Sequence, residues 1–190
     1  MTDELLNKGR KALSTGEWEK SNALLLEALK ENPSAEVYEE LAWSFWWLNN
    51  ISAVFENRSK AYELYLEKDD ILGAGRTACW IGLDYIDFKG EFAVASGWFK
   101  RAENLLKDLS DYWEIGFIKI LKARWAFEVE KNTDLAIKLI DETLELSKRL
   151  NNVDGEMLAE ALKGFILVME GKISEGMPLH DETTLDALTS

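Results

Sequence analysis

The sequence predicts an all-α fold built from about five antiparallel helical hairpins. Long stretches consist of Ala, Leu, Glu and Lys, the residues that lose least on entering a helix, and only 2 of the 190 residues are proline. Glycine or asparagine interrupts these stretches at regular intervals. Between the interruptions, apolar residues recur at steps of three and four, which is the period of an amphipathic helix.

Five short breaks divide the chain into the predicted hairpins. They lie at Gly16, Asn49, Gly90, Asn132 and Gly171, spaced by roughly 33 to 42 residues, and each interval has room for two helices and a turn. Glycine and asparagine tolerate the left-handed backbone conformation that closes a helix. Each break therefore predicts a helix end.

Ten helices follow from these breaks in chain order. The second is expected to end before Pro33, because proline cannot continue the hydrogen-bond ladder. The eighth shows the amphipathic pattern most clearly, with Leu135, Leu139 and Leu146 on one stripe and charged residues opposite. The expected ranges are 2–14, 17–31, 35–48, 51–67, 70–88, 91–107, 112–130, 133–150, 153–170 and 173–188.

Small residues recur where the two helices of a hairpin must approach closely. One stripe of each helix must be buried, and single hairpins cannot bury it alone, so the units are expected to stack. The small pairs are Gly9 with Ala28, Ala42 with Ala61, Ala95 with Ala102, and Ala123 with Ala136.

Composition excludes several classes of function. The chain carries 35 acidic and 22 basic residues, a formal charge of −13, so this segment repels nucleic acid instead of binding it. No long apolar run and no signal peptide are visible, so we expect no membrane partner and a cytoplasmic location. Cys79 is the sole cysteine and is expected to be a small buried residue. His180 is the sole histidine, which leaves no multi-histidine metal site, and no cofactor is expected.

The segment 8–33, "KGRKALSTGEWEKSNALLLEALKENP", resembles a tetratricopeptide repeat, with small residues at Gly9, Ser21 and Ala28, a turn at Gly16 and a closing Pro33. The later hairpins exceed the roughly 34 residues of such a repeat. In this longer form, carried by segments 42–70 and 84–106, the chain is similar to the N-terminal helical-repeat region of LuxR-type transcriptional regulators and of some class III nucleotide cyclases. The resemblance implies a right-handed superhelix, one domain over residues 1–190, and a regulatory arm cut from a longer regulator whose output domain lies outside these residues.

The resemblance also implies which residues face the concave groove, because in such arrays the first helix of each hairpin lines it. Independently, Trp43, Trp46 and Trp47 stand three and four apart and share one helical face, whereas Leu41 and Phe45 point elsewhere and are assigned to packing. With Ala42 as the close-contact residue, the groove positions are Leu6 and Arg10; Glu36, Glu39, Trp43, Trp46 and Trp47; Thr77, Trp80, Asp84, Asp87 and Phe88; and Leu121, Trp125, Glu128 and Val129.

The predicted groove combines indoles with carboxylates. Indole offers a flat apolar face with an N–H at its edge, and its quadrupole attracts cations. The expected occupant is therefore a peptide, a protein segment or a small effector that is cationic or amide-rich. The alternative is a scaffold or homodimerisation domain in which the same indoles are packed core. Catalysis is not expected, because no nucleophile, base and orienting group can be assembled. The predicted binding residues are Glu39, Trp43, Trp46, Trp47, Trp80, Asp84, Asp87, Trp125 and Glu128.

Overall fold

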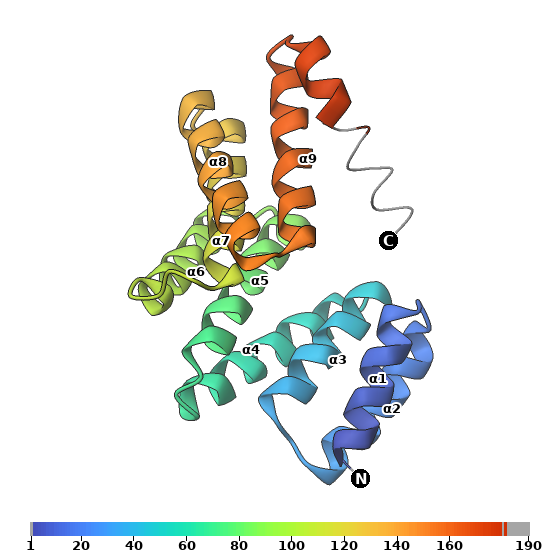
Figure 1. Ribbon diagram of the computed structural model, residues 1–190. Coiled ribbons are helices and arrows are strands. Elements are labelled where there is room, and N and C mark those ends of the chain that lie inside the picture. Colours follow the sequence, from blue (N-terminus) through green and yellow to red (C-terminus); the bar gives the residue numbers. More distant parts are fainter. Residues whose placement is uncertain (1, 180, 182–190) are drawn as a thin grey trace. The chain divides into compact units, whose positions relative to one another are not determined.

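The computed structural model describes residues 2–179 and 181, and over that part the regular structure is helical throughout (Figure 1). This confirms the predicted all-α helical repeat fold. A further helix begins at residue 173 and is described to residue 179; the rest of the predicted helix 173–188, including His180, lies outside the described residues apart from 181. The helices before it are α1 (Thr2–Ser14), α2 (Trp18–Glu31), α3 (Ala35–Trp47), α4 (Ile51–Glu67), α5 (Ile71–Lys89), α6 (Phe92–Leu106), α7 (Trp113–Glu128), α8 (Thr133–Leu150) and α9 (Val153–Met169).

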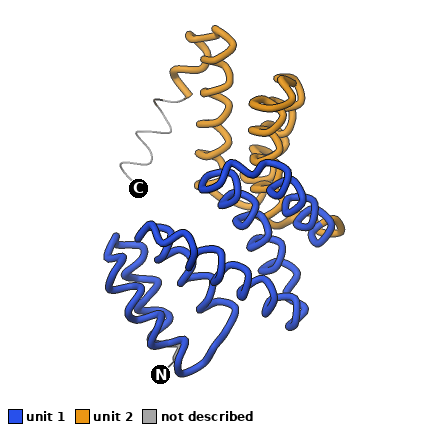
Figure 2. Tube along the Cα trace, turned by 180° about the vertical axis from the view of Figure 1, so that it is seen from behind, with its two compact units in different colours: residues 1–106 blue, residues 107–190 orange. Residues whose placement is uncertain are grey.

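The chain divides into two compact units, Met1–Leu106 and Lys107–Ser190, drawn in blue and orange in Figure 2. In unit 1, helix α1 packs on α2, α3 on α4 and α5 on α6, as the predicted hairpins require. In unit 2, α7 packs on α8, and α9 packs on both. The single domain expected over residues 1–190 stays a prediction.

At four of the turns, a left-handed residue is followed directly by the Asn or Asp that caps the next helix. The sequence predicted the left-handed residues only in part. Left-handed backbone occurs as predicted at Gly16, Asn49, Gly90 and Gly171. At the fourth break the left-handed residue is Lys131, with φ 56°, and not the predicted Asn132.

Lys131 takes the left-handed conformation because Asn132 is needed as the N-cap of α8. The Asn132 side chain accepts a hydrogen bond from the Leu135 backbone N–H at 3.1 Å and caps α8. A left-handed residue followed at once by an Asn or Asp cap occurs at Asn49–Asn50, Asp69–Asp70, Lys131–Asn132 and Asn151–Asn152.

Small residues lie at the close helix contacts, as predicted. All seven alanines of the predicted small pairs are fully buried, and so is Cys79. A Cβ on Gly9 would lie 2.7 Å from Leu25 Cγ, and one on Gly75 would lie 2.6 Å from Leu106 Cγ. A methyl group cannot fit at either position without displacing the leucine side chain that packs there.

The core of unit 2 shows what the stripes bury. Ile140 of α8 and Ile166 of α9 are fully buried and belong to one apolar cluster with Ile120 of α7. Fully burying a side chain of this size contributes about 1.5–3 kcal/mol relative to leaving it exposed. The packing of amphipathic stripes therefore holds each unit together and fixes which helix faces stay open.

Candidate binding surface

Five indoles of unit 1 form one continuous chain of ring contacts. Trp18, at the start of α2, stacks on Trp47 with centroids 4.5 Å apart and planes at 6°. Trp47 meets Trp46 edge to face at 5.0 Å, Trp46 meets Trp43 at 6.4 Å, and Trp43 meets Trp80 of α5 at 4.5 Å. We call these five residues the indole ladder. Ring pairs at such separations contribute roughly 0.5–1.5 kcal/mol each beyond their buried area.

The ladder is a half-open surface. Trp47 keeps 49% of its surface exposed, and the other four indoles are half-buried. On the other side of α3, Leu41 is fully buried and Phe45 packs against the cluster that contains Leu25 and Val37, as the helical spacing predicts. One face of α3 therefore supplies core, and the other supplies partly exposed indole.

A buried arginine lies against two rings of the ladder. Arg58 of α4 has 0% exposed surface, and its Cζ lies 4.5 Å from the Trp43 centroid and 5.4 Å from the Trp80 centroid. Its Nε donates a hydrogen bond to Asp84 Oδ2 at 2.7 Å, and Asp84 is 2% exposed.

The electrostatics of this pair follow from burial. Burial lowers the pKa of Arg58 and raises the pKa of Asp84, and in each case the opposite charge of the partner counters the shift. The Nη1 and Nη2 groups of Arg58 have no hydrogen-bond acceptor among the described residues. A buried donor without an acceptor costs about 1–3 kcal/mol, so these two groups are the least satisfied part of the surface.

Glu39 is also paired within the chain. Arg76 of α5 donates from Nε to Oε1 and from Nη2 to Oε2, both at 2.8 Å, and this two-point pair joins α3 to α5. The Tyr65 hydroxyl donates to Oε2 at 2.6 Å, and burial, helped by the Glu39 charge, raises the pKa of Tyr65. One residue further along α3, Glu40 accepts a hydrogen bond from Arg10 Nε at 2.6 Å.

These contacts correct the expected role of Glu39 and Asp84 as open carboxylates of the groove. Both are buried, and a buried carboxylate is stable only with a hydrogen-bonded partner. Thr77 is likewise buried, and its hydroxyl donates to the Gly73 carbonyl at 2.8 Å. Asp87 is exposed, one turn along α5 from Asp84.

The predicted residues of the fourth hairpin belong to unit 2. Trp125 is half-buried on α7, and Glu128 is exposed and pairs with Arg124 at 3.0 Å. The structure thus groups Trp43, Trp46 and Trp80 with Glu39 and Asp84 in unit 1, while Trp125 and Glu128 are described with unit 2.

Sequence reasoning missed two members of the surface. Trp18 lies outside the predicted groove positions, because these fall on the first helix of each hairpin and Trp18 begins the second. Arg58 is also outside the predicted groove positions, although its spacing is a signal that could have found it. It falls on the buried stripe of α4 with Val54, Ala61 and Tyr65, at steps of four, three and four. A basic residue on an apolar stripe requires a buried partner.

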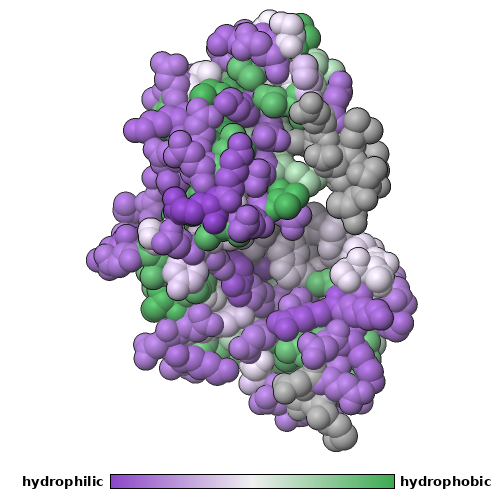
Figure 3. Space-filling view, in the orientation of Figure 1, coloured by the Kyte–Doolittle hydropathy of each residue, from purple (hydrophilic) through white to green (hydrophobic). Residues whose placement is uncertain are grey.

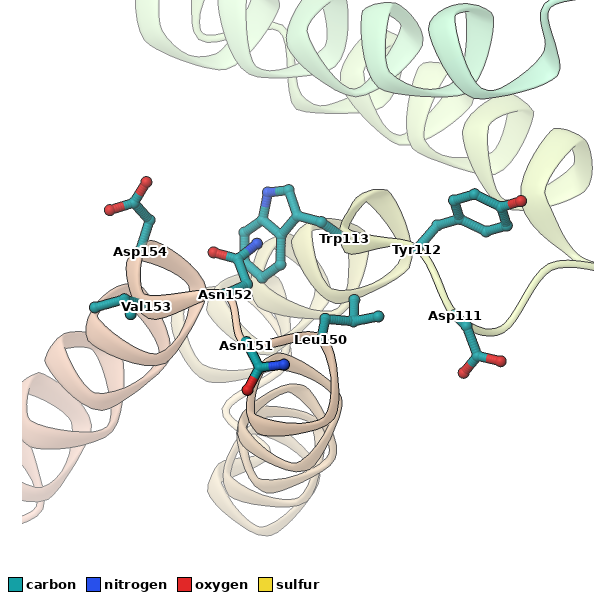
Figure 4. A pocket seen from close by; sticks show the side chains of 8 residues that line it. All are labelled: Asp111, Tyr112, Trp113, Leu150, Asn151, Asn152, Val153 and Asp154. Carbon is teal, nitrogen blue, oxygen red and sulfur yellow. The ribbon is translucent and has the colours of Figure 1, made fainter.

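Unit 2 contains a separate open pocket of about 560 Å³ where the start of α7 meets the turn between α8 and α9. Figure 4 shows the Trp113 ring in its centre, with Tyr112 and Asp154 on opposite sides of it. Asp111 pairs with Arg149 at 2.8 Å. The lining residues are Asp111, Tyr112, Trp113, Leu150, Asn151, Asn152, Val153 and Asp154.

Other kinds of site are not found in the part of the chain that the structure describes. Within it, no group of three or more His, Cys, Asp or Glu side chains could hold a metal ion. None of its helices is long and apolar enough to cross a membrane. On the face seen in Figure 3, hydrophilic residues cover most of the surface, and hydrophobic residues form smaller areas between them.

No protein-family model matches the chain, and no curated protein matches its sequence. Among solved structures, two crystal structures of the TPR-like repeats of a Podosopora anserina chain assigned as a kinesin light chain align at TM-scores of 0.65 and 0.63, with 12% and 13% identity. Both alignments cover 99% of this chain and 96% of that chain. A thermophilic TPR protein of Thermus thermophilus aligns at a TM-score of 0.59 with 17% identity, covering 97% of this chain and 100% of that chain. These similarities define the class: the chain has a TPR-like helical-repeat fold.

Proposed function

We propose that unit 1 is an interaction module that binds a peptide or protein segment on the indole ladder. TPR-like repeats are commonly used for protein interaction, and stacked repeats present extended binding surfaces. The observation that carries the proposal is the ladder itself: five indoles from α2, α3 and α5 in unbroken contact, with Trp47 49% exposed.

The ladder has the composition of an energetic centre in an interface. Residues that dominate binding energy are enriched in Trp, Tyr and Arg and cluster in one patch. The Trp18 and Trp47 rings are already stacked in the free protein. These two side chains therefore lose little conformational entropy when a partner covers them. The partner that we propose is the cationic or amide-rich segment expected from the sequence.

A packed scaffold is the second candidate, and one observation favours it for part of the ladder. Trp43 and Trp80 meet edge to face and both lie against Arg58, so these two indoles contribute to packing. A homodimer would instead use Trp47, whose ring is the most exposed of the five.

The wider role rests on the resemblance of segments 8–33, 42–70 and 84–106. We propose on that basis a non-catalytic, cytoplasmic module without a cofactor that forms the regulatory part of a transcriptional regulator. Sequencing the complete reading frame tests the last point, because a regulator of this kind encodes a DNA-binding domain beyond the repeats.

Selection from a displayed library of random dodecapeptides tests the binding function. We expect selected peptides to lose roughly 30-fold or more in affinity with Trp47→Ala, because hot-spot truncation costs about 2 kcal/mol or more. The matched control is Phe92→Ala, which removes another exposed aromatic ring, 46% exposed, from α6. Equal loss in both variants, or no selected peptide, contradicts the proposal, and a Trp47-dependent dimer in sedimentation supports the scaffold.

A further inference from the structure

The ion pairs around the indole ladder bear on the chemistry of its partner. We propose that the ladder selects an uncharged, amide-rich segment, one in which Asn, Gln and backbone carbonyl groups face the indoles, and rejects a basic one. This inference rests on the proposed function, and it separates the two partner classes that the sequence leaves open.

The carboxylates beside the ladder are neutralised within the chain. Glu39 takes two hydrogen bonds from Arg76 at 2.8 Å, and Asp84 takes one from Arg58 at 2.7 Å. A basic side chain from a partner would have to displace one of these arginines; Arg58 is fully buried, and Arg76 is half-buried and aligned with both carboxylate oxygens. Neither carboxylate can pair with an added cation without such a displacement.

Glu40 and Asp87 are further carboxylates near the ladder, and Glu36, at a predicted groove position, is half-buried. Glu40 is paired with Arg10 at 2.6 Å. Asp87 is exposed to solvent, where a surface ion pair adds almost nothing to affinity at physiological salt. Glu39, Glu40 and Asp84 are therefore paired within the protein, whereas Asp87 is open to solvent.

Two rings of the ladder already bind a cation from the protein itself. The guanidinium of Arg58 lies over the rings of both Trp43 and Trp80. A cation is attracted to the negative face of an indole, and at these two rings the protein supplies that cation itself. Both indoles are half-buried and Arg58 has no exposed surface, so a partner at these rings meets indole and not the guanidinium.

Arg58 adds a positive preference for carbonyl oxygen. Its Nη1 and Nη2 are fully buried and have no acceptor in the described chain. A carboxylate from a partner is disfavoured there, because it would meet the negative charge of Asp84, whose Oδ2 lies 2.7 Å from Nε. An amide oxygen is a neutral acceptor and does not meet this repulsion. Because Arg58 has no exposed surface, the proposal requires the Trp43 or Trp80 ring to turn aside before such an oxygen can reach Nη1 or Nη2.

Three displayed peptide libraries of one design test the inference. All share the same apolar and aromatic positions, and their polar positions hold Gln and Asn, Lys and Arg, or Glu and Asp. We expect the amide library to yield ladder-dependent clones, defined by loss of binding with Trp47→Ala, at about tenfold or greater excess over the other two. Their dissociation constants should change less than about twofold between roughly 50 and 500 mM NaCl, because few ion pairs form.

The outcomes separate the two proposals. Ladder-dependent clones from the basic or acidic library, with affinity that falls steeply with salt, overturn the inference and leave the binding function standing. No ladder-dependent clone from any library overturns both.

A variant provides a second test that keeps the buried Arg58–Asp84 pair intact. Arg76→Gln removes the partner of Glu39, so capture of the basic library should rise by about fivefold or more. The control Arg101→Gln removes an exposed arginine that lies over Trp98 on α6 and should leave the preference unchanged. If Arg76→Gln also leaves it unchanged, paired carboxylates do not set the selectivity, and the inference is overturned.

Discussion

The Arg58–Asp84 pair makes the sharpest prediction about stability. Both side chains are buried, with 0% and 2% exposed, and they are joined by one hydrogen bond of 2.7 Å. Removing one partner of such a pair leaves an uncompensated buried charge and costs about 3–5 kcal/mol. We therefore expect Asp84→Leu to lower the free energy of unfolding by about 3–5 kcal/mol near pH 7.

The double variant should behave differently. In Arg58→Met/Asp84→Leu both charges are gone, and the two unsatisfied Nη groups disappear with them. Replacing a buried pair with apolar residues of similar volume is often neutral or stabilising. We expect the double variant to lie within about 1 kcal/mol of the wild type, so the coupling between the two sites is several kcal/mol.

The single variant Arg58→Met carries a pH signature. Burial raises the pKa of Asp84, and Arg58 is the main group that opposes this rise. Without Arg58 the folded pKa lies further above the unfolded one, so the folded state gains stability as pH falls and loses it as pH rises through the folded pKa. Arg58→Met should thus be less destabilising near pH 5 than near pH 7.

Urea unfolding followed by far-UV circular dichroism measures the stability of all three variants. Tryptophan fluorescence is less suitable as a probe, because the substitutions alter the surroundings of Trp43 and Trp80. The control is the exposed pair Arg149–Asp111, 2.8 Å apart and 57% and 65% exposed, for which coupling should stay at about 1 kcal/mol or less. Additive losses at Arg58 and Asp84, with the double variant the least stable, would refute the reasoning.

Two further predictions concern packing and a surface charge. Gly75→Ala should destabilise the protein by about 1–3 kcal/mol in urea unfolding, because its Cβ would lie 2.6 Å from Leu106 Cγ. The control Gly97→Ala has nothing within 4 Å of its Cβ and should stabilise the protein by about 0.5–1 kcal/mol through helix propensity. A reversal of these signs would contradict the packing of α5 on α6. The Lys119 hydrogen bond lowers the pKa of Glu142, so its small contribution to stability is present above the unfolded pKa and is lost as pH falls through the folded one. A carboxyl NMR titration should show the Glu142 pKa rise in Lys119→Met; an unchanged pKa would rule out this pair as the cause.

Much of the fold could be predicted because it depends on local patterns. Through residue 170, every predicted helix boundary lies within two residues of the observed one, since caps and breakers act within a single turn. The pair Lys131–Asn132 shows where local reasoning fails: asparagine suits both the left-handed turn and the cap, and the position of the cap decides which role it takes.

The surface was predicted less completely, because charge pairing depends on residues far apart in the sequence. The spacing of Trp43, Trp46 and Trp47 was sufficient to place them on one helical face. It could not show that Glu39 meets Arg76, 37 residues away, or that Arg58 reaches Asp84 beneath the rings. Glu39 and Asp84, which the sequence places in the groove, are therefore paired inside the fold, whereas Asp87 is exposed.

The central claim is that the indole ladder is the surface on which a partner binds. Two-dimensional NMR of the indole N–H groups, recorded while a selected amide-rich peptide is added, tests it most directly. The account predicts that the signals of Trp46 and Trp47 shift and saturate while those of Trp98 and Trp113 stay in place. Saturating binding that shifts Trp98 and Trp113 and leaves the ladder unmoved would contradict it.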